Sequence, residues 1–269
     1  MRHNYSLPAI IRLALNLLSL SLVMPLSASV TGSQGAIATA HPIASQVGLE
    51  ILKRGGNAFD AAIAVQFTLA VVYPHAGNIG GGGFLLYHTS EGEIGALDFR
   101  ERAPLGAHRN LYLDADGNVI EGLSRNGALA VGVPGTVAGM EQLHQRFGTL
   151  PWMELLQPAI DIADNGFALT EFGAQVLNEA QHDFNRINTG KPQPFVQTEP
   201  FTPGHILRQP ALARTLQRIQ QKGAGAFYAG ETAEALVQTV RSHGGLITQE
   251  DLDQYQAIWR NSVSASCYG

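Results

Sequence analysis

Four consecutive glycines at positions 80–83 constrain the fold of this chain more than any other feature. Glycine loses more backbone freedom than other residues when it becomes ordered, and it adds no side chain to a core. A folded chain keeps such a run where its main chain must come closer to a neighbour or a ligand than a Cβ atom allows. We therefore expect Gly80, Gly81, Gly82 and Gly83 to form close-packed main chain at the floor of a site.

Arg100 follows a strand candidate, in the segment Asp98-Phe99-Arg100-Glu101. The planar guanidinium group can hold a carboxylate through two parallel hydrogen bonds, which a lysine cannot do. We predict that Arg100 binds the carboxylate of a small anionic substrate. The alternative is a surface ion pair of Arg100 with Asp98 or Glu101, and Glu101 itself is expected to stay ionised rather than act as an acid or base.

The overall composition favours a folded protein and excludes one class of partner. Hydrophobic residues make up 45% of the 269 residues and charged residues 14%, which is enough apolar material for a sizeable core in one or two domains. The net charge is -5, from 17 basic and 22 acidic residues. No basic patch for nucleic acid is expected.

The first 29 residues have the composition of a secretory signal. Arg2 and Arg12 precede a short apolar stretch over residues 13–24, and the small residues Ser27, Ala28 and Ser29 follow it. We predict that residues 1–29 are a signal peptide and that the protein is periplasmic or secreted. A membrane anchor is the alternative, but a spanning helix needs about twenty apolar residues, so no stable membrane span is expected.

Helical spacing of apolar residues, together with caps and breakers, predicts most of the secondary structure. Asn57 is the expected N-cap of a helix that is apolar on all faces and therefore buried, and Thr248 that of a short helix. The predicted helices cover residues 42–53, 58–72, 136–147, 151–164, 170–182, 210–222 and 231–243. Strands are predicted over residues 36–39, 84–88 and 94–99, the last two as a hairpin, and residues 191–204 as a proline-rich loop.

No cofactor and no metal are predicted. The glycine run leads into a strand, whereas a dinucleotide-binding fingerprint leads from a strand into a helix. Asp114, Asp116 and Asn118 hint at a calcium loop, but Val119 stands where that loop needs glycine, so we predict a turn between strands. Cys267, the single cysteine, cannot form an internal disulfide and is expected to be a buried core residue.

Three separated motifs give the stretch over residues 36–104 a family resemblance. They are Gly55-Gly56-Asn57-Ala58-Phe59-Asp60-Ala61-Ala62, the glycine run, and Leu97-Asp98-Phe99-Arg100-Glu101. In this order they resemble the N-terminal part of gamma-glutamyltransferases, also called glutathione hydrolases. The resemblance implies an α/β (α+β) N-terminal-nucleophile hydrolase fold. Two stacked sheets lie between helical layers in that αββα arrangement, which this chain would form incompletely and with a long helical excursion.

The resemblance also implies a chemistry. The family transfers or hydrolyses the gamma-glutamyl group of glutathione, using a threonine freed at the start of a small subunit by self-cleavage of the precursor, a zymogen. Arg100 matches the family arginine that binds the α-carboxylate of the substrate. No matching processing site occurs in this sequence, so residues 30–269 are expected to be a large-subunit portion with no catalytic residue, inactive without the small subunit.

Other interpretations stay open at this point. A cephalosporin or glutaryl acylase relative would share the fold and accept another acyl group, and a non-catalytic remnant would act as a binding protein. Thr39 lies two residues before His41, as in a processing site, but its context favours a structural role. Thr31 would become N-terminal after a cut at Val30, but the loose segment that follows is a poor base for a nucleophile.

Overall fold

The computed structural model describes residues 32–187 and 194–267. The chain divides into two units, Met1–Ala36 and Ile37–Gly269. In the first unit only residues 32–36 are described, and they contain neither helix nor strand. The predicted signal peptide, Thr31 and residues 191–193 of the proline-rich loop lie outside the described residues. No helix in the described part has the length and apolar character that crossing a membrane requires.

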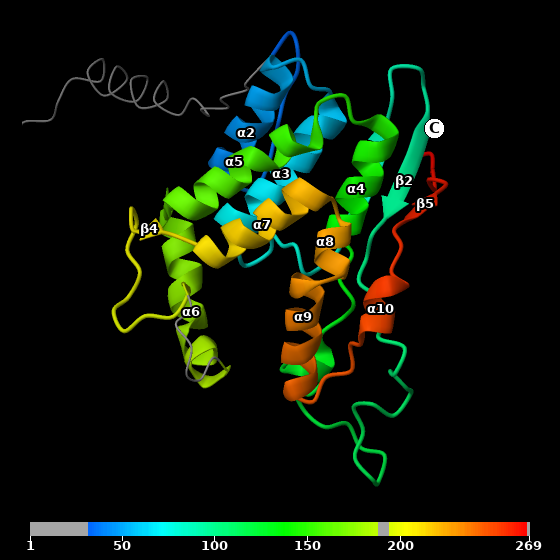
Figure 1. The fold of residues 1–269 in the computed structure, drawn as a ribbon, viewed down its shortest axis with the longest axis vertical. Coiled ribbons are helices and arrows are strands. Elements are labelled where there is room, and N and C mark those ends of the chain that lie inside the picture. Colours follow the sequence, from blue (N-terminus) through cyan, green and yellow to red (C-terminus); the bar gives the residue numbers. More distant parts are fainter. Residues whose placement is uncertain (1–31, 188–193, 268–269) are drawn as a thin grey trace, which may run out of the picture. The chain divides into compact units, whose positions relative to one another are not determined.

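The second unit is a mixed α+β structure that is mostly helical, with two small sheets (Figure 1). Its elements in chain order are α2 (Pro42–Lys53), α3 (Ala58–Val72), β1 (Phe84–His88), β2 (Ile94–Asp98), the 3-10 helix η1 (Ala128–Ala130), α4 (Thr136–Phe147), α5 (Trp152–Asn165), β3 (Phe167–Ala168), α6 (Glu171–Ile187), β4 (Ile206–Leu207), α7 (Pro210–Lys222), α8 (Gly225–Tyr228), α9 (Glu231–Ser242), α10 (Gln249–Asp253) and β5 (Ile258–Arg260).

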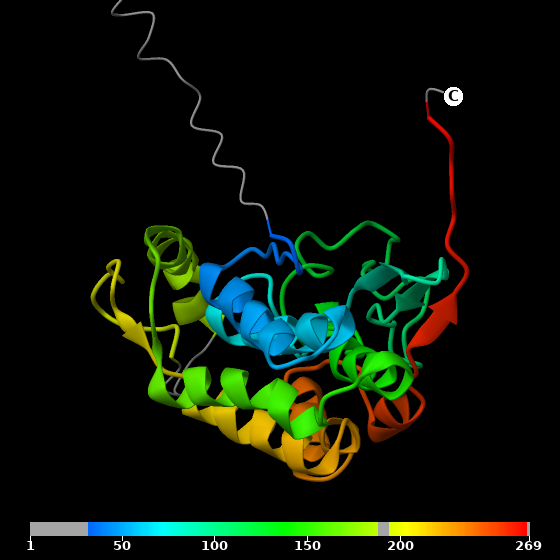
Figure 2. The same ribbon diagram turned by 90° about the horizontal axis from the view of Figure 1, so that it is seen from above.

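Helix α3 lies at the centre of the main core, in contact with α2, α4 and α5 (Figure 2). Nine of its 15 residues are buried, over more than half of its circumference, and the residues on the remaining side are mostly half-buried. Ile63, Phe67 and Val71 are fully inaccessible to solvent. Burial of such side chains is worth about 1.5 to 3 kcal/mol each, so this helix contributes strongly to the stability of the fold. The predicted bounds and burial of α3 are confirmed.

The start of α3 is fixed by a reciprocal capping box. The Asn57 side chain accepts from the backbone N–H of Asp60, and the Asp60 carboxylate accepts from the N–H of Asn57. Asp60 is fully buried and also accepts from the backbone N–H and hydroxyl of Thr149. This one carboxylate therefore ties the start of α3 to the loop before α5.

The three-stranded sheet has the order β1-β2-β5, with both pairs antiparallel. Tyr87 and Leu97 point to one face of this sheet and are buried. On the opposite face Phe84, Leu86 and Ile94 are 65%, 72% and 56% exposed. Because successive side chains of a strand alternate between faces, this pattern leaves one face of the sheet apolar and uncovered in the described part of the chain.

Several expectations are corrected. Residues 36–39 form no strand, because no backbone group in the described part of the chain pairs with them in a ladder. Cys267 is exposed rather than buried: residues 261–267 run away from the helices after β5, so nothing packs around its thiol (Figure 2). Helix α6 continues to Ile187, past the predicted end at His182, since no glycine or proline interrupts it. Pro151 is the N-cap of α5 and not its first residue.

The acidic segment over residues 113–119 forms the predicted turn, but an isolated bridge closes it and not the two strands that were expected. Leu113 and Val119 form an isolated antiparallel bridge, and the Asp114 carboxylate accepts from the backbone N–H groups of Asp116 and Asn118. These bonds close the loop through its own backbone. Among the described residues no group of three or more His, Cys, Asp or Glu is placed to hold a metal ion.

Replacing Asp60 by asparagine should destabilise the chain by about 2 to 3 kcal/mol, because an amide nitrogen would face N–H groups that now donate to a charged carboxylate. Asp161→Asn is the matched control, since Asp161 is exposed and accepts only from Gln157 one turn away. Its cost should be below about 0.5 kcal/mol. Urea unfolding measures both, and equal midpoints would contradict the role given to Asp60.

His41 gives the fold a dependence on pH. Its Nδ1 accepts the N–H of Ile43 at 3.3 Å and caps α2, and burial lowers the pKa of the imidazole. In the unfolded chain the imidazole takes up a proton near pH 6.5, whereas in the folded chain it does so only at lower pH. The free energy of unfolding should therefore decrease as the pH falls below 6.5. In His41→Asn, which keeps a capping acceptor, the decrease should be smaller; the same pH profile in both proteins would rule the effect out.

Candidate functional site

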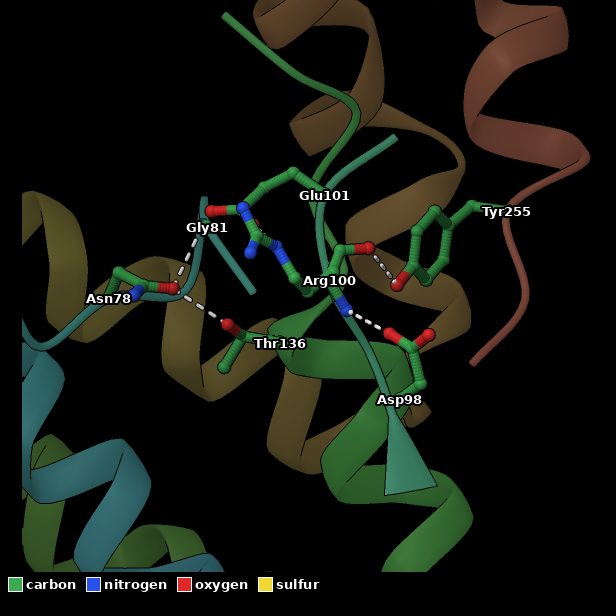
Figure 3. A network of polar contacts seen from close by, with 7 residues as sticks. All are labelled: Asn78, Gly81, Asp98, Arg100, Glu101, Thr136 and Tyr255. Atoms are coloured by element: carbon green, nitrogen blue, oxygen red, sulfur yellow. Dashed lines mark hydrogen bonds and ion pairs between the residues drawn. The ribbon is translucent and has the colours of Figure 1, made fainter. Parts of the chain in front are cut away.

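The glycine run packs directly against the turn that carries Arg100 (Figure 3). A Cβ atom added to Gly82 would lie 2.9 Å from the carbonyl carbon of Arg100 and 2.7 Å from the nitrogen of Glu101. One added to Gly83 would lie 2.9 Å from the ring of Phe99. These distances are shorter than carbon contacts allow, so both positions need glycine. The expected close packing is wrong for Gly80, because no atom of the described residues lies within 4 Å of a Cβ atom added there.

The first turn of α4 holds the glycine run in place. The backbone N–H groups of Gly135 and Thr136 donate to the carbonyl oxygen of Gly81 at 2.7 and 3.0 Å. The Asn78 side-chain oxygen accepts from the N–H of Gly81 at 2.8 Å and from the buried Thr136 hydroxyl at 2.7 Å (Figure 3). The unpaired N–H groups of a helix start thus find acceptors in the run, which orders it.

The peptide groups on both sides of the Arg100 Cα atom are also held. Its backbone N–H donates to Asp98 Oδ1 at 3.1 Å, and its carbonyl oxygen accepts from the Tyr255 hydroxyl at 2.8 Å. The second oxygen of Asp98 accepts from Nε of Arg260 at 2.7 Å. The segment after α10, which continues into β5 beside β2, therefore contacts the turn through Tyr255 and Arg260.

The Arg100 side chain is 64% exposed and leaves the turn on the side away from Tyr255 (Figure 3). Its Nε lies 3.9 Å from Glu101 Oε2, the outer limit of an ion pair, and its guanidinium carbon lies 5.7 Å from the centre of the Phe84 ring. Within the described residues the guanidinium group donates no hydrogen bond. The neighbouring Arg102, in contrast, donates to the carbonyl oxygen of Gln256 and lies over the Tyr255 ring.

Two ionisable groups around the turn have shifted pKa values. The hydrogen bond from the Arg100 N–H, assisted by Arg260, lowers the pKa of Asp98, so this carboxylate stays charged. Burial raises the pKa of Tyr255 to about 12, so its hydroxyl remains a neutral donor at physiological pH. Among the described residues of this site, Arg100 is the cation whose guanidinium group donates no hydrogen bond, since its contact with Glu101 is at the outer limit of an ion pair. Its fork can therefore bind a carboxylate.

A cavity of about 350 Å³ lies elsewhere, between the start of α2, the end of α3 and α6. Tyr73, His75, Phe167 and Phe172 contribute aromatic rings to its lining, with His41 at the cap of α2. None of the described residues that line it is an arginine, lysine, aspartate or glutamate. It is unsuited to bind a charged group, and the Arg100 turn is the better candidate.

Sequence reasoning found the two central parts of the site, the glycine run and Arg100, and the structure brings them into contact. It assigned no role to Asn78, Thr136 or Tyr255. Asn78 stood inside the quoted motif, so its proximity to the glycines was a usable signal. Tyr255 lies 155 positions from Arg100 and gave no local signal. The Thr39 hydroxyl donates to the carbonyl oxygen of His41 at 2.8 Å, in agreement with the structural role expected for it.

Comparison with known proteins identifies the family. The sequence model described as gamma-glutamyltranspeptidase matches residues 44–269. The glutathione hydrolase proenzyme of Pseudomonas sp. (strain A14) is 51% identical over 230 residues, which are 85% of this chain and 40% of that protein. The chain therefore belongs to the gamma-glutamyltranspeptidase family, and it spans about two fifths of the length of this curated relative.

Solved structures agree with this assignment. The crystal structure of Helicobacter pylori gamma-glutamyltranspeptidase matches with a TM-score of 0.85 and 44% identity, over 90% of this chain and 69% of that chain. The cephalosporin acylase of Bacillus halodurans matches with a TM-score of 0.76 and 31% identity, over 92% of this chain and 48% of that chain. Acylases of that kind are thus among its structural relatives.

Replacing Gly82 by alanine should destabilise the chain by about 1 to 3 kcal/mol, because the added methyl group meets backbone atoms that cannot move aside separately. Gly80→Ala is the matched control in the same run. It should be neutral or slightly stabilising, since the methyl group has free space and the backbone of Gly80 is not in the left-handed region. Thermal unfolding of the two variants compares them, and similar losses would show that the close contact at Gly82 is unimportant.

Proposed function

We propose that this chain is the large-subunit portion, residues 30–269, of a protein that hydrolyses or transfers the gamma-glutamyl group of glutathione and related amides. Arg100 is the residue that binds the α-carboxylate of the gamma-glutamyl substrate. The observation that supports this role is its exposed guanidinium group, free of hydrogen bonds within the described residues, on a turn whose backbone is held on both sides. A carboxylate would complete its two parallel donor positions.

The nucleophile in this proposal is a threonine of a small subunit, outside these 269 residues. Thr136 is unsuited to the role, because its hydroxyl is buried and donates to Asn78. The matched region is only 40% of the Pseudomonas proenzyme. The remaining length of that relative is enough for a further subunit. No metal or cofactor is part of the proposed reaction.

The uncovered face of the β1-β2-β5 sheet is evidence for a partner subunit. Phe84, Leu86, Ile94 and Ile258 are exposed there at 65%, 72%, 56% and 38%. An apolar face of this kind is costly in water and marks a surface that packs against another layer. We propose that the second sheet of an αββα sandwich packs on this face in the complete protein.

Residues 1–29 are proposed to direct export as a signal peptide, with the mature protein in the periplasm or secreted. Arg2 and Arg12 before an apolar stretch support this assignment. Sequencing the N-terminus of the exported protein tests it: a mature protein that still begins at Met1 would contradict the cleavage.

A second acyl specificity has support from the similarity to the Bacillus halodurans cephalosporin acylase. The complete protein separates the two functions when it is given a gamma-glutamyl anilide and a glutaryl anilide in parallel. The glutaryl group keeps the terminal carboxylate and lacks only the α-amino group of the gamma-glutamyl group. We expect release from the gamma-glutamyl compound; release from the glutaryl compound alone would favour the acylase, and binding without release a non-catalytic protein.

In the complete protein, Arg100→Lys should raise the KM for the gamma-glutamyl donor by about 10- to 100-fold, because a lysine keeps the charge and loses the two parallel hydrogen bonds. Arg109→Lys is the matched control, since Arg109 is exposed and outside the site. Steady-state kinetics measure both variants. An unchanged KM in Arg100→Lys would remove the proposed role of this residue.

A further inference from the structure

We propose that Tyr255 is a positioning residue for Arg100, assisted by the ion pair of Asp98 with Arg260. The inference rests on the proposed function of Arg100. An arginine whose side chain is 64% exposed has few neighbours to direct it. The backbone from which the side chain starts therefore sets the position and direction of its Cα–Cβ bond, and that backbone is held by two hydrogen bonds at 3.1 and 2.8 Å.

One short segment of the chain acts on both of these restraints, directly through Tyr255 and indirectly through Arg260. Tyr255 donates directly to the carbonyl oxygen of Arg100. Arg260 donates to Asp98, whose other oxygen accepts the N–H of Arg100. The pairing of β5 with β2 fixes this segment in register, with Asp98 opposite Ile258. Residues 255–260 thus act on Arg100 from the side of the turn opposite to its guanidinium group.

The surroundings of Tyr255 hold its hydroxyl in one place. The side chain is 8% exposed, and its ring stacks on Tyr228 at 5.8 Å between centroids with an interplanar angle of 5°. The guanidinium carbon of Arg102 lies 5.3 Å from the centre of the Tyr255 ring. Gly135 leaves room for the hydroxyl, because a Cβ atom there would collide with it. These contacts belong to the ring, so Tyr255→Phe removes the hydrogen bond and retains the packing.

The carbonyl oxygen of Arg100 depends on Tyr255 for its hydrogen bond. Among the described residues, the carbonyl oxygen of Arg100 accepts no other hydrogen bond. Loss of the hydroxyl would let the peptide between Arg100 and Glu101 rotate, and the guanidinium group would sample more directions. A preorganised cation binds its carboxylate with a smaller loss of entropy than a mobile one, so the effect falls on substrate binding.

The test uses the complete protein and four variants: Tyr255→Phe, Arg100→Lys, the double variant and Tyr112→Phe. Tyr112 is the matched control, because its hydroxyl also donates to a backbone carbonyl, that of Leu129 at 3.0 Å. The readouts are KM and kcat with a gamma-glutamyl anilide, and the Kd for L-glutamate by calorimetry. In Tyr255→Phe we expect KM and Kd to rise about three- to tenfold, with kcat changed less than about twofold.

The double variant identifies the route of the effect. If Tyr255 acts through Arg100, its loss adds nothing once the bidentate group is gone, so the double variant should match Arg100→Lys. Independent, multiplying effects would overturn the proposal. The proposal would also be overturned if KM rose in Arg100→Lys and stayed unchanged in Tyr255→Phe, because the carboxylate site would then be intact without the Tyr255 hydroxyl. An unchanged KM in Arg100→Lys would instead remove the proposed function on which the inference rests.

A further variant covers the case in which Tyr255→Phe fails to fold. Arg260→Gln removes the ion pair with Asp98 at a side chain that is 55% exposed, where substitution is well tolerated by the fold. We expect a smaller rise of KM, about twofold, because Asp98 keeps its bond to the Arg100 N–H. Where Tyr255→Phe does not fold, a KM of Arg260→Gln equal to that of the parent protein would overturn the proposal.

Discussion

The backbone of Gly82 lies against the peptide groups around Arg100, and the rest of the site depends on this contact. The free space between these two stretches of main chain is too small for a methyl group. Gly135 and Thr136 close the arrangement by donating to the carbonyl oxygen of Gly81. A cation that must meet a small substrate in a defined direction is best carried by such a rigid turn, since a rigid turn has little entropy left to lose on binding.

Two packed regions support this turn from different sides. The main core lies around α3, and the loop that follows α3 leads into the glycine run. A smaller cluster of buried side chains, Val133, Ala233, Val240, Ile247, Leu252 and Tyr255, holds the segment from which the Tyr255 hydroxyl reaches Arg100. The site therefore lies where the two regions meet, and loosening of either one would reach Arg100 through backbone hydrogen bonds.

Local sequence signals predicted the long helices well. The bounds of α3, α4 and α7 are those expected. Asn57 caps α3, Pro210 begins α7 and Gly135 precedes α4, and a glycine or proline follows the end of each helix. Strands β3, β4 and β5 were missed, since two or three residues are too few to show an alternating pattern. The strand expected over residues 36–39 and the buried Cys267 were wrong for a common reason: both depend on a partner that the described part of the chain does not supply.

The sequence by itself determined the family, the helical framework and the two residue types that matter at the site, because glycine runs and arginines carry their meaning in their own chemistry. Only the tertiary structure decided that, within the described residues, the Arg100 guanidinium group donates no hydrogen bond while that of Arg102 donates one. The same holds for Tyr255, which reaches Arg100 from 155 positions away. The physical reason is that hydrogen-bond partners are assigned by the packing of distant segments, which no local pattern records.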